Sequence, residues 1–175
     1  MPCSQTLSGI TRDCSPSLGG IVEVYIANFA DVTAKTITSD KITAITMASS
    51  AKFRKYEFRR NTGSLSSTYQ INAENGSTFV QSDLVLVFNR METSKRVEIV
   101  ALAQGELCAI VKDANGVYWY LGDEEPLVAS AGDGLTGTQR SDRNGYSVTL
   151  QDVSSALPIE VLVGTGGVDL SEIVA

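Results

Sequence analysis

The chain has 175 residues and a formal net charge of −6 at pH 7, with 43% apolar and 19% charged residues. This length can bury the core of one domain, and the acidic balance argues against a nucleic-acid binder that relies on overall positive charge. The sequence contains no histidine, which excludes Ser-His-Asp and Cys-His catalysis, histidine-bearing zinc sites and facial-triad iron sites.

The first segment, residues 1–20, is polar and rich in turn-forming residues, so we expect an N-terminal arm there. It lacks the apolar region of a signal peptide, and no run reaches transmembrane length, which predicts cytoplasmic synthesis and no membrane contact. Three irregularly spaced cysteines do not form a disulfide framework, although Cys3 and Cys14 can pair. Cys108 lies in an apolar strand and is predicted to be a buried, inert thiol.

Residues 21–163 are predicted to form a single β-rich domain. Its first half contains short apolar or alternating runs, and an Asn75-Gly76 pair predicts a hairpin. The strands expected here are 21–29, a weak one around Ile37, 42–46, 53–60, 68–73 and 78–81.

The run 53–60 interleaves basic and aromatic residues. Strand alternation places Arg54, Tyr56, Phe58 and Arg60 on one side, and Phe53, Lys55, Glu57 and Arg59 on the other. Such a strand can bind single-stranded nucleic acid through charge and stacking, or form an interface in which arginine stems pack on neighbouring rings. The overall negative charge favours the structural contact.

One amphipathic helix is predicted at about 94–104, after an apolar strand that begins at Leu84. Thr93 or Ser94 is the expected N-cap, and Gly105 is expected to end the helix in a left-handed conformation. The residues at helical spacing are Val97, Val100, Ala101 and Gln104, and Leu102 and Ala103 widen the expected apolar side.

A hairpin follows the helix, with strands at 107–111 and 117–121 joined by Asn115-Gly116. Asp113 and Asn115 also suggest a calcium loop, but the later acidic ligands of an EF-hand are missing. Residues 123–126 then form an acidic corner, and 130–137 is a mobile loop by composition.

The chain ends in two further predicted strands and a tail. Asn144-Gly145 borders a hairpin strand at 146–150, and 158–163 is the last strand. Residues 164–175 are expected to form a C-terminal tail. Like the N-terminal arm, this tail is expected to have little core of its own.

Charge is unevenly distributed along the sequence. Residues 35–60 carry seven basic and two acidic residues, a local +5, whereas residues 98–133 carry seven acidic and one basic, a local −6. Two interpretations fit: a positive face of one copy meets a negative face of the next, or the two are unrelated solvated faces. The candidate subunit-interface residues are Arg54, Tyr56, Phe58, Arg59, Arg60, Asp123, Glu124 and Glu125.

The order of these features resembles that of tail-tube-like and tail-ring structural proteins of tailed bacteriophages, particularly the crAss-like phages of gut Bacteroidales. The resemblance rests on the basic-aromatic strand 52–58, the Asn-Gly hairpin, the apolar strand, the Lys95-Arg96 helix and the hairpin 113–119. Residues 3–20, with Leu-Ser-Gly-Ile, Asp13-Cys14 and Gly19-Gly20, are similar to the N-terminal segment of such proteins. The similarity covers most of residues 1–163.

The resemblance implies a mainly β fold, a small barrel or sandwich flanked by one helix, with extended terminal arms. It further implies a virion protein whose copies join edge to edge into a six- or twelve-fold ring, in a phage tail or portal-tail connector. Other tail or portal proteins would be its partners. DNA would pass through the channel without sequence-specific binding, because a negative lumen repels phosphates.

Two other classes compete with this expectation. The first is a glycan- or ligand-binding β-sandwich module with Tyr118, Trp119 and Tyr120 as an aromatic platform, although consecutive strand residues alternate faces. The second is an enzyme built on carboxylates, which need to face each other across a cleft. The adjacent acids at 123–125 do not fit that geometry, and no nucleotide-binding or hydrolase motif is present. We therefore expect no enzyme, no catalytic residue, no metal and no cofactor.

Overall fold

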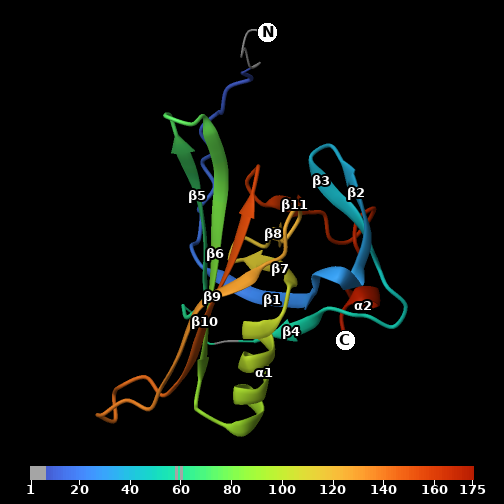
Figure 1. Ribbon diagram of the computed structural model, residues 1–175. Helices are drawn as coiled ribbons and strands as arrows, with labels where there is room; N and C mark the ends of the chain where they lie inside the picture. Colours follow the sequence, from blue (N-terminus) through green and yellow to red (C-terminus); the bar gives the residue numbers. More distant parts are fainter. Residues whose placement is uncertain (1–6, 58, 60) are drawn as a thin grey trace.

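The computed structural model describes residues 7–57, 59 and 61–175. The chain is mainly β, with 50% strand, 11% helix and two helices, and its strands form two sheets. The molecule is elongated (Figure 1). A long hairpin and the N-terminal arm project at one end, and the longer helix lies at the other. The expected mainly β class is therefore confirmed.

Seven strands form the larger sheet, in the order β2-β3-β11-β8-β7-β1-β4. The neighbours are antiparallel except for the parallel pair β11 and β3. A short 3₁₀ turn, Phe29–Asp31, links β1 to β2. The strands are β1 Ile21–Asn28, β2 Val32–Thr38, β3 Lys41–Met47, β4 Arg54–Tyr56, β7 Leu107–Asp113, β8 Tyr118–Leu121 and β11 Ile159–Val161.

Four longer strands form the second sheet, in the order β5-β6-β10-β9, and every neighbouring pair is antiparallel. The paired register of β5 and β6 is continuous over nine residues. The strands are β5 Ser64–Asn72, β6 Ser77–Asn89, β9 Val128–Leu135 and β10 Gly145–Ser154.

Apolar side chains on both faces of the seven-stranded sheet build two cores. One face, with Val24, Ile26 and Val111, packs on Leu84 and Leu150 of the four-stranded sheet. The opposite face carries the second core, which residues of β1, β3, β7, β8 and β11 form together with the C-terminal residues; its buried members include Tyr25, Ile110, Tyr120, Ile42 and Ile173. Central strands buried on both faces explain why 21–26 and 107–111 read as nearly continuous apolar runs.

The predicted helix is confirmed as α1, Thr93–Gln104, but its details differ from expectation. Its N-cap is Glu92, without a side-chain capping bond, and Gly105 has an extended φ of −86°. A Cβ on Gly105 would lie 2.9 Å from the Leu107 side chain, so close packing accounts for this glycine. Leu102 is the buried residue of α1, whereas Val97 and Val100 are 58% and 47% exposed. The predicted apolar side was therefore right for Leu102 and wrong for Val97 and Val100.

The Asn115-Gly116 hairpin is confirmed and joins β7 to β8. Asp113 Oδ1 accepts hydrogen bonds from the backbone N–H groups of Asn115 and Val117, and Gly116 has a positive φ of 86°. The Asp113 carboxylate thus organises the turn, as the non-calcium interpretation of this sequence predicts.

Residues 130–137 were predicted to be a loop, and this prediction was wrong. Residues 128–135 form β9, which pairs with β10 from Leu135↔Gly145 to Val128↔Gln151. Glycine and serine disfavour strands locally, but pairing with a strand of ten residues supplies the hydrogen bonds that the composition does not predict.

The C-terminal residues 164–175 were expected to have little core of their own, and they instead pack onto the domain. Val168 and Ile173 are buried in the second core, and a short helix, α2 Leu170–Ile173, begins after the capping side chain of Asp169. The backbone of Phe53 bonds to both Ile173 and Ala175. Only the N-terminal end is an arm: residues 7–20 contain no regular secondary structure.

Candidate assembly surface

The two edges of the four-stranded sheet are long and little protected. β5 has nine residues, with no charge, no proline and no break in register. β9 has eight residues, a single acidic side chain, Asp133, and one bulge opposite Thr149/Leu150. Among the described residues, no backbone hydrogen bond joins the N-terminal arm to either edge. Both edges therefore present unpaired N–H and C=O groups.

The edges of the seven-stranded sheet differ, because each carries a feature that discourages pairing. β2 has two register shifts against β3 and contains Lys35. β4 is only three residues long and contains Arg54 and Lys55. Bulges, short length and lysines are the devices by which natural proteins prevent edge-to-edge association. The chain therefore protects the edges of one sheet and leaves those of the other open.

Strand direction makes the open edges compatible with each other. Because four strands alternate in direction, β5 and β9 run opposite ways. When copies are related by rotation about an axis along the strands, β9 of one copy meets β5 of the next in antiparallel orientation. The alternation then continues around a closed ring without interruption.

The outward face of the four-stranded sheet carries polar and apolar side chains, and its strands contribute no basic residue; Arg143, from the β9–β10 connection, pairs with Asp133 on this face. Paired register places Ser66, Asp83 and Gln151 on this face, opposite the core residues Leu84 and Leu150. None of the 14 lysines and arginines lies in β5, β6, β9 or β10. Since tight binding to phosphates requires cationic side chains, this face does not attract a nucleic-acid backbone.

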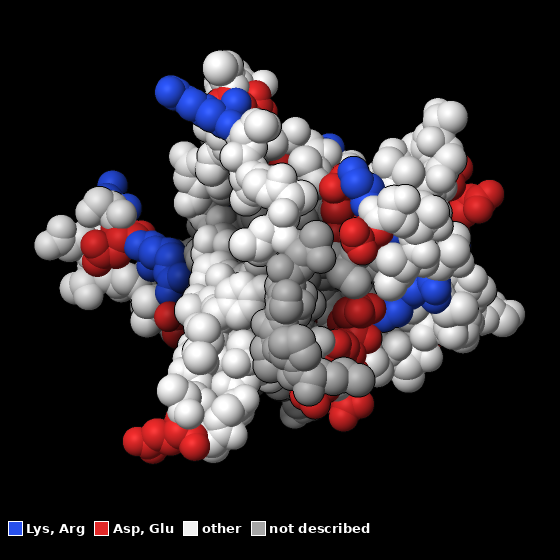
Figure 2. Space-filling view, turned by 90° about the horizontal axis from the view of Figure 1, so that it is seen from above, with Lys and Arg blue, Asp and Glu red and all other residues white. Residues whose placement is uncertain are grey.

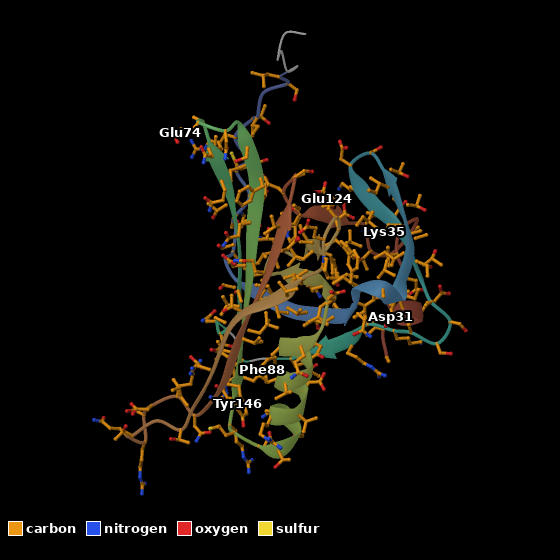
Figure 3. All side chains as sticks on the ribbon, viewed as in Figure 1. Asp31, Lys35, Glu74, Phe88, Glu124 and Tyr146 are labelled. Carbon is orange, nitrogen blue, oxygen red and sulfur yellow. The ribbon has the colours of Figure 1, made fainter. Side chains whose placement is uncertain are left out.

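Seen from the end where the β5–β6 hairpin projects, basic and acidic residues lie in small, separate groups around broad uncharged areas (Figure 2). Glu74 lies at the tip of that hairpin, and Phe88 and Tyr146 lie beside α1 at the opposite end (Figure 3).

Comparisons with protein-family models, curated proteins and solved structures gave no match.

The structure places the predicted acidic corner in contact with the same chain. The Lys35 ammonium pairs with Asp123, and the Glu124 carboxylate accepts hydrogen bonds from the Ser155 backbone N–H and hydroxyl. Those bonds lower the pKa of Glu124. Glu125 is exposed. Part of the predicted charge complementarity is thus satisfied within one molecule.

The predicted basic strand is shorter than expected and is also engaged internally. Tyr56 is half-buried and donates a hydrogen bond to Glu98 of α1. Arg54 and Arg59 are exposed and form no ion pair among the described residues. Phe58 and Arg60 lie outside the described residues, as does Cys3, so a Cys3–Cys14 pair stays a prediction. Among the described residues, neither Arg54 nor Glu125 forms an ion pair.

The three aromatic residues at 118–120 do not share a face. Tyr120 is 1% exposed and lies in the second core, while the Trp119 indole N–H donates to Asp113 at 3.2 Å.

Cys108, which lies in the same core, is a buried thiol whose pKa is raised to about 11 by burial, as expected of an inert cysteine. In the described part of the chain, no group of three acidic or cysteine side chains can hold a metal ion. Neither described helix is long and apolar enough to cross a bilayer.

Asp152 is the only acidic side chain that the structure buries, among the described residues, and it lies where the two sheets meet. It is 3% exposed; Oδ2 accepts the Gly122 N–H at 3.2 Å, and Oδ1 has no described partner. Burial raises the pKa of Asp152, and the charges of Asp123, Glu124 and Glu125 raise it further, against the opposing Gly122 bond. The ionised form is therefore destabilised in the folded state.

We expect the free energy of unfolding of Asp152→Asn to rise, relative to that of the unchanged chain, as the pH rises. A raised folded-state pKa means that the folding contribution of the protonated Asp152 is present below about pH 4 and is lost as the pH rises through the folded pKa. Asparagine keeps the acceptor for Gly122 and cannot ionise. Urea unfolding between pH 4 and 8 measures the difference. The control is Asp133→Asn, an exposed carboxyl whose pKa is lowered by Ser147; its contribution changes only as the pH falls below about 4, so its difference from the unchanged chain is expected to stay nearly constant from pH 5 to 8.

If the free energy of unfolding of Asp152→Asn differs from that of the unchanged chain by the same amount at every pH, the raised pKa of Asp152 is contradicted.

The candidate assembly surface carries no charged patch and was not predicted from the sequence. The available signal was the lack of lysine and arginine in four separate segments, 64–72, 77–89, 128–135 and 145–154. That pattern becomes visible only after pairing unites the segments in one sheet.

Proposed function

We propose that this chain is a virion structural subunit, which forms an oligomeric ring or tube segment in a phage tail or portal-tail connector. Copies join through β9 of one subunit and β5 of the next, and the outward face of the four-stranded sheet surrounds the DNA channel. The role is mechanical and not catalytic. The resemblance of the sequence to tail-tube-like and tail-ring proteins supports the virion setting.

The observation that carries this proposal is the contrast between the two sheets. The edges of one are short, charged or bulged, whereas the edges of the other are long, nearly uncharged and opposite in direction. Unprotected edges promote association. A rotationally repeated β9–β5 pair satisfies both edges of every subunit with a single kind of contact, so the assembly closes.

The absence of basic residues from the strands of this face supports the channel role. DNA must move through a tail without being held, and a wall whose strands carry no lysine or arginine makes few counterion-releasing contacts with phosphates. Asp83 adds a weak repulsion on that face, whereas Asp133 is paired with Arg143. Six-fold and twelve-fold rings are both compatible with this arrangement.

Hydrogen exchange in the assembled and the diluted protein tests the proposal. Half of the amides in each edge strand point away from the sheet, and those of β5 and β9 are expected to exchange at least about ten-fold more slowly in the assembly. The amides of β2, an edge of the other sheet, serve as the internal control and are expected to be unchanged. Protection of β2 in place of β5 and β9 would overturn the proposed contact.

A further inference from the structure

An apolar groove lies between α1 and β9, at the end of the molecule opposite the β5–β6 hairpin. Its volume is about 460 Å³, and its lining includes Ile99, Val100 and Ala103 from the helix and Ala129, Gly132 and Val148 from the sheet. The small residues of β9 leave this space open, because they cannot fill the gap beneath the helix. The groove belongs to the face of β9 and not to its backbone edge.

The N-terminal arm carries apolar side chains that contact nothing in the described part of the molecule. Leu7 is 91% exposed and Ile10 is fully exposed at 101%. The arm is fixed only near its base, where Leu18 and Asn115 exchange two hydrogen bonds and the Ala114 N–H donates to Gly20. Between residues 7 and 17, the one hydrogen bond is local, from the Ser15 N–H to Asp13.

The arm and the groove lie at opposite ends of one molecule. The arm runs past the β5–β6 hairpin, away from α1 (Figure 1). The arm of a copy therefore points away from its own groove and toward the groove of a copy placed above it. An extended chain rises about 3.3 Å per residue, so the segment from Gly20 to Leu7 spans roughly 40 Å, enough to reach a neighbour.

We propose that Leu7 and Ile10 of one copy insert into the α1–β9 groove of a second copy, so that successive subunit layers join end to end. This inference rests on the proposed ring function, because it names the contact between rings. An arm that leaves one end and a groove at the other form a heterologous contact, which repeats without closing and builds a stack.

Cysteine trapping tests the contact directly. Two differently tagged full-length chains are co-expressed, both with Cys3→Ser and Cys14→Ser, one with Leu7→Cys and the other with Val100→Cys. We expect a disulfide-linked heterodimer after mild oxidation. The matched control replaces Val100→Cys by Val97→Cys: both valines are exposed on α1, but Val97 does not line the groove. Its yield is expected to be several-fold lower.

Substitution of the arm gives a second, independent readout. Leu7→Glu with Ile10→Glu removes two apolar anchors, and we expect layer-to-layer association to weaken by at least about ten-fold, with single rings retained. The control is Leu18→Glu, an exposed leucine at the fixed base of the arm, which is expected to leave stacking unchanged. Electron micrographs distinguish single rings from stacks.

The outcomes separate the two proposals. Rings without a Leu7–Val100 cross-link would overturn the arm contact and leave the ring function standing. A cross-link in a protein that forms no rings would support the arm contact and overturn the ring function. A Leu7→Cys, Val100→Cys chain that links internally, or equal yields with Val97→Cys and Val100→Cys, would also overturn the arm contact.

Discussion

A Thr68→Lys chain is expected to fold and to lose its ring assembly. Thr68 is exposed on β5, opposite Gln81, so a lysine there meets no buried neighbour in the single molecule. In the assembly, the added lysine lies on an edge strand directly beside β9 of the next copy. Lysines on edge strands discourage strand pairing, so we expect association to weaken by at least about ten-fold.

The matched control for this prediction is Thr36→Lys, which places the same change on β2, an exposed edge strand of the other sheet. Thermal unfolding of dilute protein confirms that both variants are folded, and light scattering at high concentration measures assembly. If Thr68→Lys assembles as the unchanged chain does, or if Thr36→Lys is the variant that fails, β5 is not the contact.

Gly145→Ala is expected to have the largest effect on folding. Gly145 begins β10 with a positive φ of 158°, and a Cβ at this position would lie 2.0 Å from the carbonyl oxygen of Phe88. The backbone of the central pair β6–β10 must shift to admit the methyl group. We expect a loss of at least about 3 kcal/mol in the free energy of unfolding, which lowers Tm by roughly 6–12 °C.

Gly19→Ala is the control for this substitution, because a Cβ on Gly19 meets nothing within 4 Å and its φ is not positive. Calorimetry of both variants measures the effect. A Gly145→Ala chain as stable as Gly19→Ala would show that the close approach of Phe88 to Gly145 is relieved without cost.

The elements that the sequence predicts well are those with local signals. Asn115-Gly116 and Asn75-Gly76 turns connect strands where expected, because a glycine with positive φ fixes each turn within a few residues. The single long helix also lies within one residue of its expected start. Alternation and turn chemistry require no knowledge of distant parts of the chain.

The features that sequence reasoning missed depend on distant partners. β9 is a strand because β10 pairs with it, and the C-terminal residues are part of the domain because Phe53 bonds to them. Val97 and Val100 were assigned to the buried side of α1, but the helix rests on the sheets mainly through Leu102 and the half-buried Ile99. Spacing predicts an apolar stripe and does not predict which part of it the fold covers.

The candidate interface shows the same limit. Lys35 and Asp123 are 88 positions apart, and the fold joins them in one ion pair, so opposite charges in distant segments do not by themselves indicate contact between copies. The open edges of the four-stranded sheet, by contrast, follow from strand order and direction. Neither the Lys35–Asp123 ion pair nor the open edges can be predicted from a single segment of the sequence.

The most direct test of the central claim is the mass of the purified protein in solution, measured across concentration by sedimentation and compared with electron micrographs. The account predicts closed rings at a fixed multiple of the 18.6 kDa chain. A single 18.6 kDa species at every concentration, with no ring in the micrographs, would contradict it.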